Sequence, residues 1–474
     1  MKLIYDVNDK PKFGQLIIFA IQQLLAIMTA TLVVPVIIGN GMSPAAALFG
    51  AGVGTLVYIL FTRKKSPVFL GSSFAFIGSM LAAFAGGVSM SLGYLGIIIG
   101  AVFAGLVYVV IAIIVKLVGV KWIDKVMPAT VIGPIVAIIG LSLAGNAIGD
   151  LLKGGVTKEV TDFVVGYSEA GVAELVSQTS AVPVASPFVA LLCGLVTLII
   201  TIISSTYGKK YGKLIPFIFG ILGGYALAGI FTIIGYKCGV DALKVLNVAP
   251  FIALAPEGKI TLETFIKVPD FTFLTAFKGV GELNATYVGT IAVAYVPVAF
   301  VVFAEHLADH KNISSIIEKD LLVEPGLHRT LLGDGIGSMV GAIFGGCPNT
   351  TYGESVGCVA ITKNASVYTI ITAAILAIII SFISPFIAFV NSIPSCIMGG
   401  VCMALYGFIA VSGLKMIQGV DLNHNKNLFV VSTILIAGIG GLTLTFGKIT
   451  LTSVACALIL GIIVNACVSK AKDE

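Results

Sequence analysis

The chain has little charge for its length. Asp, Glu, Lys and Arg make up only 11% of its 474 residues, whereas 58% of the residues are hydrophobic. Soluble domains carry about 25% charged residues, so this composition excludes a set of water-soluble domains. The mean hydropathy of +1.07 agrees. The sequence therefore predicts an integral membrane protein, with the bilayer as its solvent.

Several motifs of energy conversion and catalysis are also absent. The sequence has no phosphate-binding loop of the Walker type, no arginine-rich span, no His-Glu-x-x-His helix and no nucleophile elbow. Drive by ATP and intramembrane enzymology are accordingly disfavoured, and we expect a transporter driven by an ion gradient or by none. The polar start, Met1 to Phe13, runs straight into a full-length apolar span, so we expect no cleaved signal peptide.

Cysteine is scattered rather than paired. None of the eight cysteines has the spacing of a zinc site or a redox motif, so we interpret them as small core residues and expect no metal and no cofactor. They are Cys193, Cys238, Cys347, Cys358, Cys396, Cys402, Cys456 and Cys467.

Apolar runs of the length that a bilayer requires divide the chain into fourteen predicted spans. They cover residues 14–38, 44–61, 67–85, 92–117, 128–149, 187–205, 214–235, 286–306, 328–345, 354–362, 366–389, 395–412, 428–446 and 449–468. An even number of crossings places both chain ends on one side of the membrane. No nucleic-acid-binding patch is expected from the net charge of +5, which we interpret as a topology signal.

The basic residues fall at alternate ends of these spans, which indicates that both termini are cytoplasmic. They are Lys2, Lys10, Lys12, Arg63, Lys64, Lys65, Lys116, Lys121, Lys125, Lys209, Lys210, Lys213, Lys311, Lys319, Lys363, Lys426 and Lys470. Two long polar connections, 150–186 and 236–283, fall on the outside and carry acidic residues. These are Asp150, Glu159, Asp162, Glu169, Glu174, Asp241, Glu257 and Glu263.

The third and tenth spans are interrupted by residues that break helices. Gly71, Ser72 and Ser73 interrupt the third, and the stretch from Pro348 to Gly353 interrupts the tenth. Non-helical backbone at membrane depth needs a protein interior or a wet cavity around it. Two breaks in corresponding places favour an inverted repeat of seven plus seven spans, with a binding site between the breaks. The alternative is two ordinary loops and a lower number of spans.

Two carboxylates are the first candidates for a binding site. An ionisable residue at the centre of a spanning helix raises the free energy of membrane insertion by roughly 2.5–3.5 kcal/mol, so each such residue is expected to have a role. Glu305 ends the eighth span, and Glu354 opens the tenth helix directly after Gly353. Glu354 can be a simple helix cap. With free backbone N–H groups, the aromatic Phe74 in the matching break and the second carboxylate, it can also line a pocket for a flat, polar, neutral ring.

Other polar residues in this region leave alternatives open. Asp309 lies one turn after Glu305 and can share a proton with it, or can simply end the helix. We interpret His306 and His310 as cytoplasmic end residues, and Asp334 as a residue of topology or of a helix end. The segment Lys311–Leu322 is predicted to be an amphipathic helix on the inner surface, with the role of a connector.

Four stretches of these spans resemble a known family. They are Gly71-Ser-Ser-Phe-Ala-Phe76, Ala304-Glu-His306, Asp320-Leu-Leu with Pro325-Gly-Leu-His-Arg329, and Pro348-Asn-Thr-Thr-Tyr-Gly-Glu354. The sequence looks like the nucleobase/ascorbate transporters, also called nucleobase-cation symporters, and most closely like the bacterial uracil permeases. The resemblance runs along nearly the whole chain.

The resemblance implies an all-α polytopic fold. Its fourteen segments form two inverted repeats, split into a core and a gate domain and often dimeric through the gate, and short strands begin the third and tenth segments. On this chain the core comprises spans 1–4 and 8–11, and the gate comprises spans 5–7 and 12–14. The corresponding parts are 1–149 (spans 1–5), 150–235 (outside loop, spans 6–7), 236–394 (outside loop, spans 8–11) and 395–474 (spans 12–14 and tail).

The resemblance also implies roles for single residues. Glu305 and Glu354 would accept hydrogen bonds from the ring nitrogens of uracil, while the backbone at Phe74 and Gly353 would meet its carbonyl oxygens. Glu305, Asp309 and Glu354 are the candidates for proton coupling. Supporting positions are Gln22, Gln23, Ser73, Thr351 and Tyr352.

Three departures from the family pattern stand out. Gln22-Gln23 stands where many relatives have Gln-His. Ser355 follows Glu354 where the family signature has Asn, which loosens the assignment of the substrate. Asp309 stands where some uracil permeases have His, so the handling of the proton stays open.

The leading hypothesis is a uracil importer of the cell (inner) membrane that uses protons, with Na⁺ as the other possible ion and a homodimer as the expected assembly. Xanthine or uric acid follows as the substrate. An anion exchanger of the same general fold and a channel-like protein without coupling are the alternatives from other classes.

Overall fold

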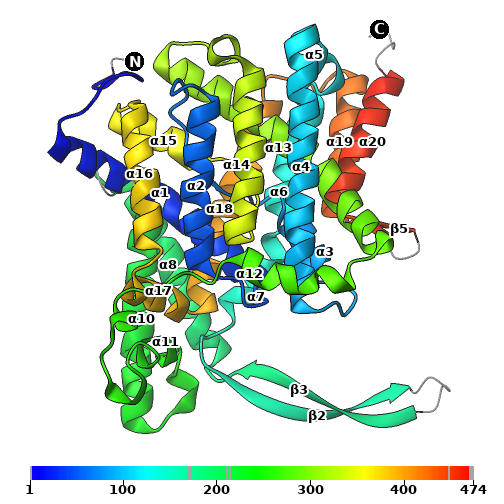
Figure 1. Ribbon diagram of the computed structural model, residues 1–474. Helices are drawn as coiled ribbons and strands as arrows, with labels where there is room; N and C mark the ends of the chain where they lie inside the picture. Colours follow the sequence, from blue (N-terminus) through cyan, green and yellow to red (C-terminus); the bar gives the residue numbers. More distant parts are fainter. Residues whose placement is uncertain (1–2, 168–172, 210–211, 213–214, 447–448, 469–474) are drawn as a thin grey trace. The chain divides into compact units, whose positions relative to one another are not determined.

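A computed structural model describes residues 3–167, 173–209, 212, 215–446 and 449–468 (Figure 1). The chain divides into two compact units. Unit 1 comprises Met1–Leu143, Thr261–Ile387 and Leu405–Glu474, and unit 2 comprises Ala144–Ile260 and Ala388–Ala404. The sequence predictions for Lys2, Glu169, Lys210, Lys213 and Lys470 concern positions outside the described residues.

Helices dominate both units. The helices of unit 1 are α1 (Phe13–Ile38), α2 (Pro44–Phe61), α3 (Ile77–Ala83), α4 (Met90–Val118), α5 (Lys121–Val126), α6 (Ala129–Ser142), α12 (Thr272–Ala276), α13 (Ala285–Ile317), α14 (Leu327–Gly345), α15 (Gly353–Thr362), α16 (Val367–Ile380), α19 (Asn425–Ile439) and α20 (Ser453–Val468). Its strands are β1 (Leu70–Ser72), β4 (Asn349–Thr351), β5 (Leu444–Phe446) and β6 (Ile449–Leu451). Unit 2 contains α7 (Ala144–Leu151), α8 (Pro187–Tyr207), α10 (Pro216–Cys238), α11 (Ala249–Ile252), β2 (Thr157–Tyr167) and β3 (Ala173–Pro183). The boundaries between the units fall within α17 (Ser384–Ser392) and α18 (Ser395–Ile417).

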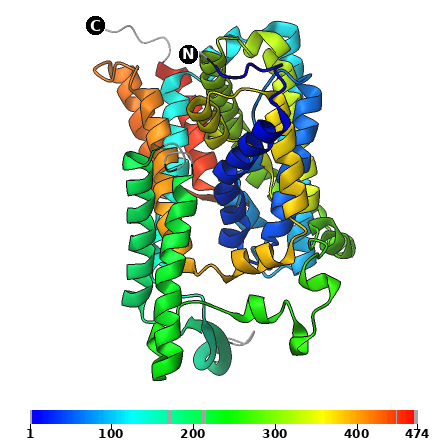
Figure 2. The same cartoon turned by 90° about the vertical axis from the view of Figure 1, so that its left-hand side faces the viewer.

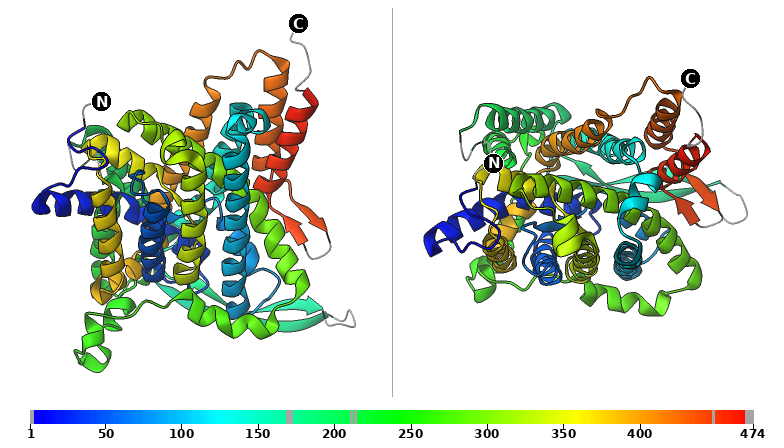
Figure 3. Two further views of the ribbon diagram at one scale, coloured as in Figure 1. Left: turned by 45° about the horizontal axis from the view of Figure 1, so that its top comes forward. Right: turned by 90° about the horizontal axis from the view of Figure 1, so that it is seen from above.

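The helices α16, α2, α14 and α4 form a row in unit 1, as the end-on view in Figure 3 shows. Small residues allow α2 and α14 to approach each other closely. A Cβ on Gly54 would lie 2.8 Å from the carbonyl oxygen of Gly337, and a Cβ on Gly345 would lie 2.6 Å from that of Ala46. Glycine at such contacts lets helix backbones meet where lipid provides no hydrophobic drive.

In unit 2, α8 and α10 pack side by side (Figure 2). A Cβ on Gly220 would lie 2.7 Å from the carbonyl oxygen of Thr197, so this pair also depends on a small residue at its contact. The connection that follows α7 contains the antiparallel pair of strands β2 and β3. The sequence analysis predicted only a polar connection here. Similarly, it placed residues 444–446 in span 13 and residues 449–451 in span 14, where the structure has the paired short strands β5 and β6.

The structure confirms a many-helix membrane protein. Among the described residues, eight helices are long and apolar enough to cross a bilayer, and α16, α19 and α20 are shorter apolar helices. The number of fourteen spans and the inverted repeat stay predictions. The two broken segments are confirmed, because each consists of a three-residue strand followed by a short helix: β1 with α3, and β4 with α15.

The prediction of a separate surface helix over Lys311–Leu322 is wrong. Helix α13 runs without interruption from Ala285 to Ile317, over 33 residues, and takes up most of that segment. It ends at Glu318, which adopts a left-handed conformation with a φ of 55°. The polar residues after Asp309 therefore extend the spanning helix beyond the apolar core rather than starting a new helix.

The chain's polar beginning is bound to the loop that follows α15. The backbone N–H of Ile4 donates to the carbonyl of Lys363 at 2.7 Å, and Tyr5 pairs with Asn364 as an isolated bridge. The N–H of Val367 donates to the carbonyl of Val7 at 3.0 Å. We call residues 4–9 the N-terminal strap. It attaches the start of the chain to the C-terminal end of α15.

Candidate functional site

The two breaks are joined to each other in unit 1. Strands β1 and β4 pair antiparallel, with Leu70 opposite Thr351 and Ser72 opposite Asn349. One further bond extends the ladder at the end of β1, where the N–H of Ser73 donates to the carbonyl of Pro348 at 2.9 Å. The pairing satisfies backbone groups that would otherwise be unpaired in the protein interior.

Tyr352 fastens the second break to the first. Its hydroxyl donates to the carbonyl of Ser72 at 2.7 Å, and its ring lies where a side chain on Gly71 would be. Asn349 holds β4 from the other side, because its Nδ2 donates to the carbonyl of Gly50 at 3.1 Å. The glycine in the first break is therefore required by an aromatic ring in the second.

The N-terminus of α15 is open to solvent in unit 1. Gly353 is exposed, and Glu354 is partly exposed in the first turn of the helix. The first N–H groups of a helix have no intrahelical partner, and the helix dipole favours negative or hydrogen-bond-accepting groups there. This end of α15 thus presents backbone donors next to a carboxylate acceptor.

Helix α13 brings two more carboxylates to the same region. Asp309 Oδ2 accepts a hydrogen bond from Thr351 Oγ1 at 2.9 Å, and Asp309 Oδ1 lies 3.6 Å from where a Cβ on Gly353 would be. Glu305 lies one turn earlier on α13 and is partly exposed. Helix α13 continues past Asp309 to Ile317, so Asp309 does not end the helix, and its sharing of a proton with Glu305 stays a prediction.

Phe74 follows β1 and borders a cavity. Its side chain is 9% exposed, and its ring contacts that of Tyr406 edge-on with 5.9 Å between the centroids. A cavity of about 190 Å³ lies against it. The walls of this cavity come from α3, α6, α13 and the start of α20, and include Ser142 and Thr452.

The predicted supporting residues differ in what they contact. Gln23 is buried, and its Nε2 donates to Ser355 Oγ on α15. Gln22 is partly exposed, but its Oε1 is buried and has no hydrogen-bond partner among the described residues. Ser73 Oγ is likewise buried without a partner within that part of the chain. Among the described residues, Gln23, Thr351 and Tyr352 are therefore tied to the site by side-chain hydrogen bonds, and Gln22 and Ser73 are not.

The structure corrects the interpretation of three polar residues as helix ends. The side chains of His306 and Asp334 are 0% and 1% exposed, and His310 is 0% exposed. His306 Nδ1 lies 2.6 Å from Asp334 Oδ2, and its Nε2 lies 3.0 Å from Thr330 Oγ1. These residues form a buried polar network between α13 and α14. Because it is costly to bury polar groups in a membrane helix, the presence of these residues in predicted spans was the signal that could have revealed the network.

One arrangement of protons satisfies the donors and acceptors of this network. In it, Thr330 Oγ1 donates to the carbonyl of Leu327 at 3.0 Å and accepts from His306 Nε2, which then carries a hydrogen. Two lone pairs cannot face each other at 2.6 Å, so a further proton lies between His306 Nδ1 and Asp334. The pair is neutral in sum whichever partner holds that proton, which removes the penalty of an isolated buried charge.

His310 continues the network toward the end of α2. Its Nδ1 donates to the carbonyl of His306 at 2.8 Å, and its Nε2 lies 2.7 Å from the hydroxyl of Tyr58. That hydroxyl lies 2.7 Å from Ser66 Oγ, so every link is a hydrogen bond between buried groups. The two imidazole rings stack with 4.0 Å between their centroids.

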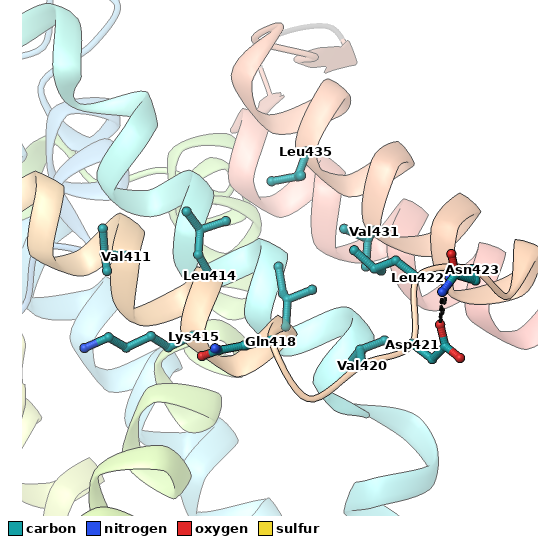
Figure 4. A pocket seen from close by; sticks show the side chains of 11 residues that line it. Val411, Leu414, Lys415, Gln418, Val420, Asp421, Leu422, Asn423, Val431 and Leu435 are labelled. Atoms are coloured by element: carbon teal, nitrogen blue, oxygen red, sulfur yellow. Dashed lines mark hydrogen bonds between the residues drawn. The ribbon is translucent and has the colours of Figure 1, made fainter.

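A groove of about 640 Å³ lies elsewhere in unit 1, between the end of α18 and the start of α19 (Figure 4). Apolar side chains such as Leu414 and Val431 line it, and Asp421 at its end accepts hydrogen bonds from Asn423. Neither Glu305 nor Glu354 lines this groove, so it is separate from the candidate site.

Comparisons with known proteins identify the family. A family model described as the Permease family matches residues 14–185 and 163–447. The chain is 35% identical to the uracil permease of Bacillus subtilis (strain 168), with 100% of this chain and 97% of that protein covered. It belongs to the nucleobase permease family that includes the uracil permeases. As a member of this permease family, the protein is a transporter and not an enzyme.

Two further comparisons define what is shared. The uracil permease of Escherichia coli (strain K12) is 33% identical, with 96% of this chain and 92% of that protein covered. Among solved structures, the transmembrane domain of the cyanobacterial bicarbonate transporter BicA matches 97% of this chain and 100% of its own with a TM-score of 0.59. Its identity is only 14%, so this likeness shows the fold of the permease and nothing about its substrate.

Proposed function

We propose that this permease imports uracil by symport with protons and that the base binds between the two breaks of unit 1. The observation that carries the proposal is Glu354 in the first turn of α15, next to the exposed backbone of Gly353 and across from the carboxylates of α13. Full-length relatives that are uracil permeases support a pyrimidine base as the substrate.

In the proposed complex each edge of the base meets a complementary group. Neutral uracil offers two ring N–H donors and two carbonyl acceptors. The carboxylates of Glu305 and Glu354 accept from the ring nitrogens, and the backbone N–H groups at Phe74 and Gly353 donate to the carbonyl oxygens. The ring of Phe74 supplies an apolar face for the flat base. The second break thus supplies both a donor and an acceptor.

Proton coupling is proposed to use the carboxylates around α15. Glu305, Asp309 and Glu354 place three carboxyl groups close together: Asp309 follows Glu305 by one turn of α13, and its Oδ1 lies 3.6 Å from where a Cβ on Gly353, next to Glu354, would be. Repulsion among like charges favours binding of a proton by one member of such a group. A proton on one carboxylate leaves the others free to accept hydrogen bonds from the base, which links the binding of the proton to that of uracil.

We also propose the organisation that the sequence indicates. The permease lies in the cell membrane with both termini in the cytoplasm, spans 1–4 and 8–11 form the core that holds the base, and the remaining spans form a gate through which two copies associate. The clusters of basic residues at alternate span ends support the cytoplasmic placement.

The alternatives predict different substrates. Xanthine or uric acid would need a larger site between the same breaks. An anion exchanger would use the free N–H groups of α15, but the carboxylate of Glu354 in that first turn repels an anion. The fold shared with a bicarbonate transporter does not change this, because it concerns the backbone alone.

The test is uptake of radiolabelled uracil by proteoliposomes, with and without an inward proton gradient, and with Na⁺ replaced by choline. We expect gradient-driven accumulation that Glu354→Gln reduces more than about 100-fold, because a neutral amide oxygen is a weaker acceptor for the ring N–H than a carboxylate and cannot take up a proton. Glu257→Gln is the matched control, since that carboxylate is exposed on the connection 236–283 and, among the described residues, pairs with Lys259 alone.

Each other result points to one alternative. Accumulation of xanthine but not uracil would reassign the substrate, and uptake that ignores the proton gradient would remove the coupling. Failure to transport either base, with folded protein and exchange of bicarbonate or sulfate, would contradict the nucleobase proposal.

A further inference from the structure

Phe69, which directly precedes β1, is hydrogen-bonded to residues on both sides of the first residues of α15. The carbonyl of Phe69 accepts from the N–H of Tyr352 at 3.2 Å, and the N–H of Phe69 donates to Ser355 Oγ at 3.0 Å. Gly353 and Glu354 lie between these two attachment points in the sequence. The two hydrogen bonds of Phe69 therefore hold in place the stretch of backbone that carries the side chain of Glu354 and the N–H of Gly353.

Gln23 completes this bracket from a third element. Its Nε2 donates to the same Ser355 Oγ that Phe69 uses, so one buried hydroxyl joins α1, the approach to β1 and the first turn of α15. Ser355 is 0% exposed and Gln23 is 2% exposed. Water cannot replace either partner, so loss of one leaves a buried polar group unpaired. We call Gln23, Phe69 and Ser355 the Gln23–Ser355 clamp.

We propose that Gln23 and Ser355 are positioning residues for the nucleobase: the clamp sets the direction of the first turn of α15, and with it the place of Glu354 and Gly353 relative to the base. This inference rests on the proposed function. Neither residue needs to touch the base. Edge-by-edge hydrogen bonding is sensitive to displacements below 1 Å, so a loosened turn lowers affinity although all recognising groups remain.

The position of the clamp explains why it acts on recognition rather than on folding. Strand β4 is held independently by Asn349, by the pairing with β1 and by the hydroxyl of Tyr352. Removal of the clamp leaves these attachments in place and frees only the turn that follows. We therefore expect a local effect at residues 353–356.

The experiment compares four variants: Ser355→Ala, Gln23→Met, the double variant, and Thr372→Ala as control. Met keeps the length of Gln23 without its amide. Thr372 loses a hydroxyl that donates only to the carbonyl of Tyr368 within α16. Two measurements are made on the full-length protein: KM and Vmax for uracil uptake, and hydrogen exchange of peptides that cover residues 349–358.

We expect Ser355→Ala and Gln23→Met each to raise KM about tenfold at a Vmax within about twofold of the parent, as loss of one well-placed hydrogen bond predicts. Exchange at 353–356 should accelerate in both and stay unchanged in the control. The double variant should be no worse than the worse single variant, because both changes break the same clamp.

The outcomes separate this proposal from the proposed function. Unchanged KM and unchanged exchange in Ser355→Ala overturn the clamp. A fall in Vmax and in thermal stability at unchanged KM shows a merely structural role and overturns it as well. If no variant, nor the parent, transports uracil while exchange still accelerates at 353–356 in both single variants, the uracil assignment fails and the clamp stands as the device that positions Glu354.

Discussion

The β1–α3 break and the β4–α15 break have the same order of elements but are held in place in different ways. The first has no ionisable residue from Leu70 to Ala83, and its Ser73 hydroxyl has no partner among the described residues. In the second, Thr351, Tyr352 and Ser355 each make a side-chain hydrogen bond to another element, and Glu354 begins the helix. In the proposed complex, recognition by side chains is therefore concentrated in the second break, while the first supplies backbone and an aromatic wall.

The largest effect is expected at Gly71 of the first break, against which the ring of Tyr352 from the second break packs. Gly71→Ala places a methyl group in the ring of Tyr352, so the strands β1 and β4 must separate. Overpacking of this kind costs about 1–3 kcal/mol or more, and we expect loss of uracil uptake with a lower thermal midpoint. The control is Gly78→Ala in α3, whose new Cβ would have its nearest neighbour at 3.9 Å, a methyl carbon of Thr452. Equal tolerance of both variants would contradict the close contact.

A second prediction concerns the buried network behind the second break. Asp334→Ala leaves His306 Nδ1 without a partner in the interior, which costs about 1–3 kcal/mol of folding free energy. Asp334→Asn can donate to that nitrogen, and should retain most of the stability. Thermal unfolding in detergent measures both. If Asp334→Asn is as destabilising as Asp334→Ala, the two residues form an ion pair, with the proton on His306 and a negative charge on Asp334 that Asn cannot supply.

A third prediction separates the two breaks by their hydroxyl groups. Tyr352→Phe removes the bond to the carbonyl of Ser72 and should cost about 1 kcal/mol. Ser73→Ala removes a buried hydroxyl without a partner among the described residues, so it should be neutral or slightly stabilising. The comparison of their unfolding midpoints tests the asymmetry directly. A destabilising Ser73→Ala would show that the end of β1 depends on a side-chain bond, in addition to the bond that Ser79 Oγ of α3 donates to the carbonyl of Ala294.

The smallest effect is expected at the C-terminal end of α15 in the second break, to which the N-terminal strap is bound. Lys319 Nζ donates to Asp6 Oδ2 at 2.5 Å, and this bond holds the pKa of Asp6 below its ordinary value. Both side chains are 46% exposed, so Asp6→Asn should cost less than about 1 kcal/mol, and less still at high salt.

The sign of the pH dependence follows from that lowered pKa. The pair contributes its stability above the pKa of an unfolded Asp, about 3.9, and loses it as the pH falls through the lower folded value. The difference between parent and Asp6→Asn should therefore be constant from about pH 5 to 8 and vanish only in acid. Unfolding midpoints across this range check it. A difference that changes near pH 6 would have to come from another group.

Part of this architecture could be predicted from the sequence, because it depends on local chemistry. Gly71, Ser72 and Pro348 are unfavourable in a helix that faces lipid, so both breaks are visible without a structure. The pairing of β1 with β4 could be expected only from the resemblance to the family. Nothing local distinguishes two strands that pair with each other from two separate loops.

The buried network was missed for a physical reason. His306 and Asp309 are followed by Lys311 and Asn312, a pattern typical of the end of a spanning helix. However, α13 is 33 residues long in total, longer than a bilayer requires, and His306 faces Asp334 of α14 rather than water. Sequence position does not show which neighbour a long helix has at its end.

Two departures from the family pattern turned out to be one feature. Gln23 stands where many relatives have His, and Ser355 stands where the family signature has Asn. The two positions are far apart in the sequence, so the sequence analysis treated them separately. The structure places Gln23 Nε2 on Ser355 Oγ, so the two residues meet in a single hydrogen bond. An exchange at one position therefore has to be considered together with the other.

The distance along the chain between the two paired breaks also has a consequence for biosynthesis. The hydroxyl of Tyr352 and the carbonyl of Ser72 are 280 residues apart. During translation the first break enters the membrane long before its partner strand exists, with backbone groups that lipid cannot satisfy. Nascent chains must therefore be sheltered at this stage, by the insertion machinery or by water. A chain that stops before Asn349 should be recognised as incomplete and degraded, which makes the second break a checkpoint for quality control as well as a place of recognition.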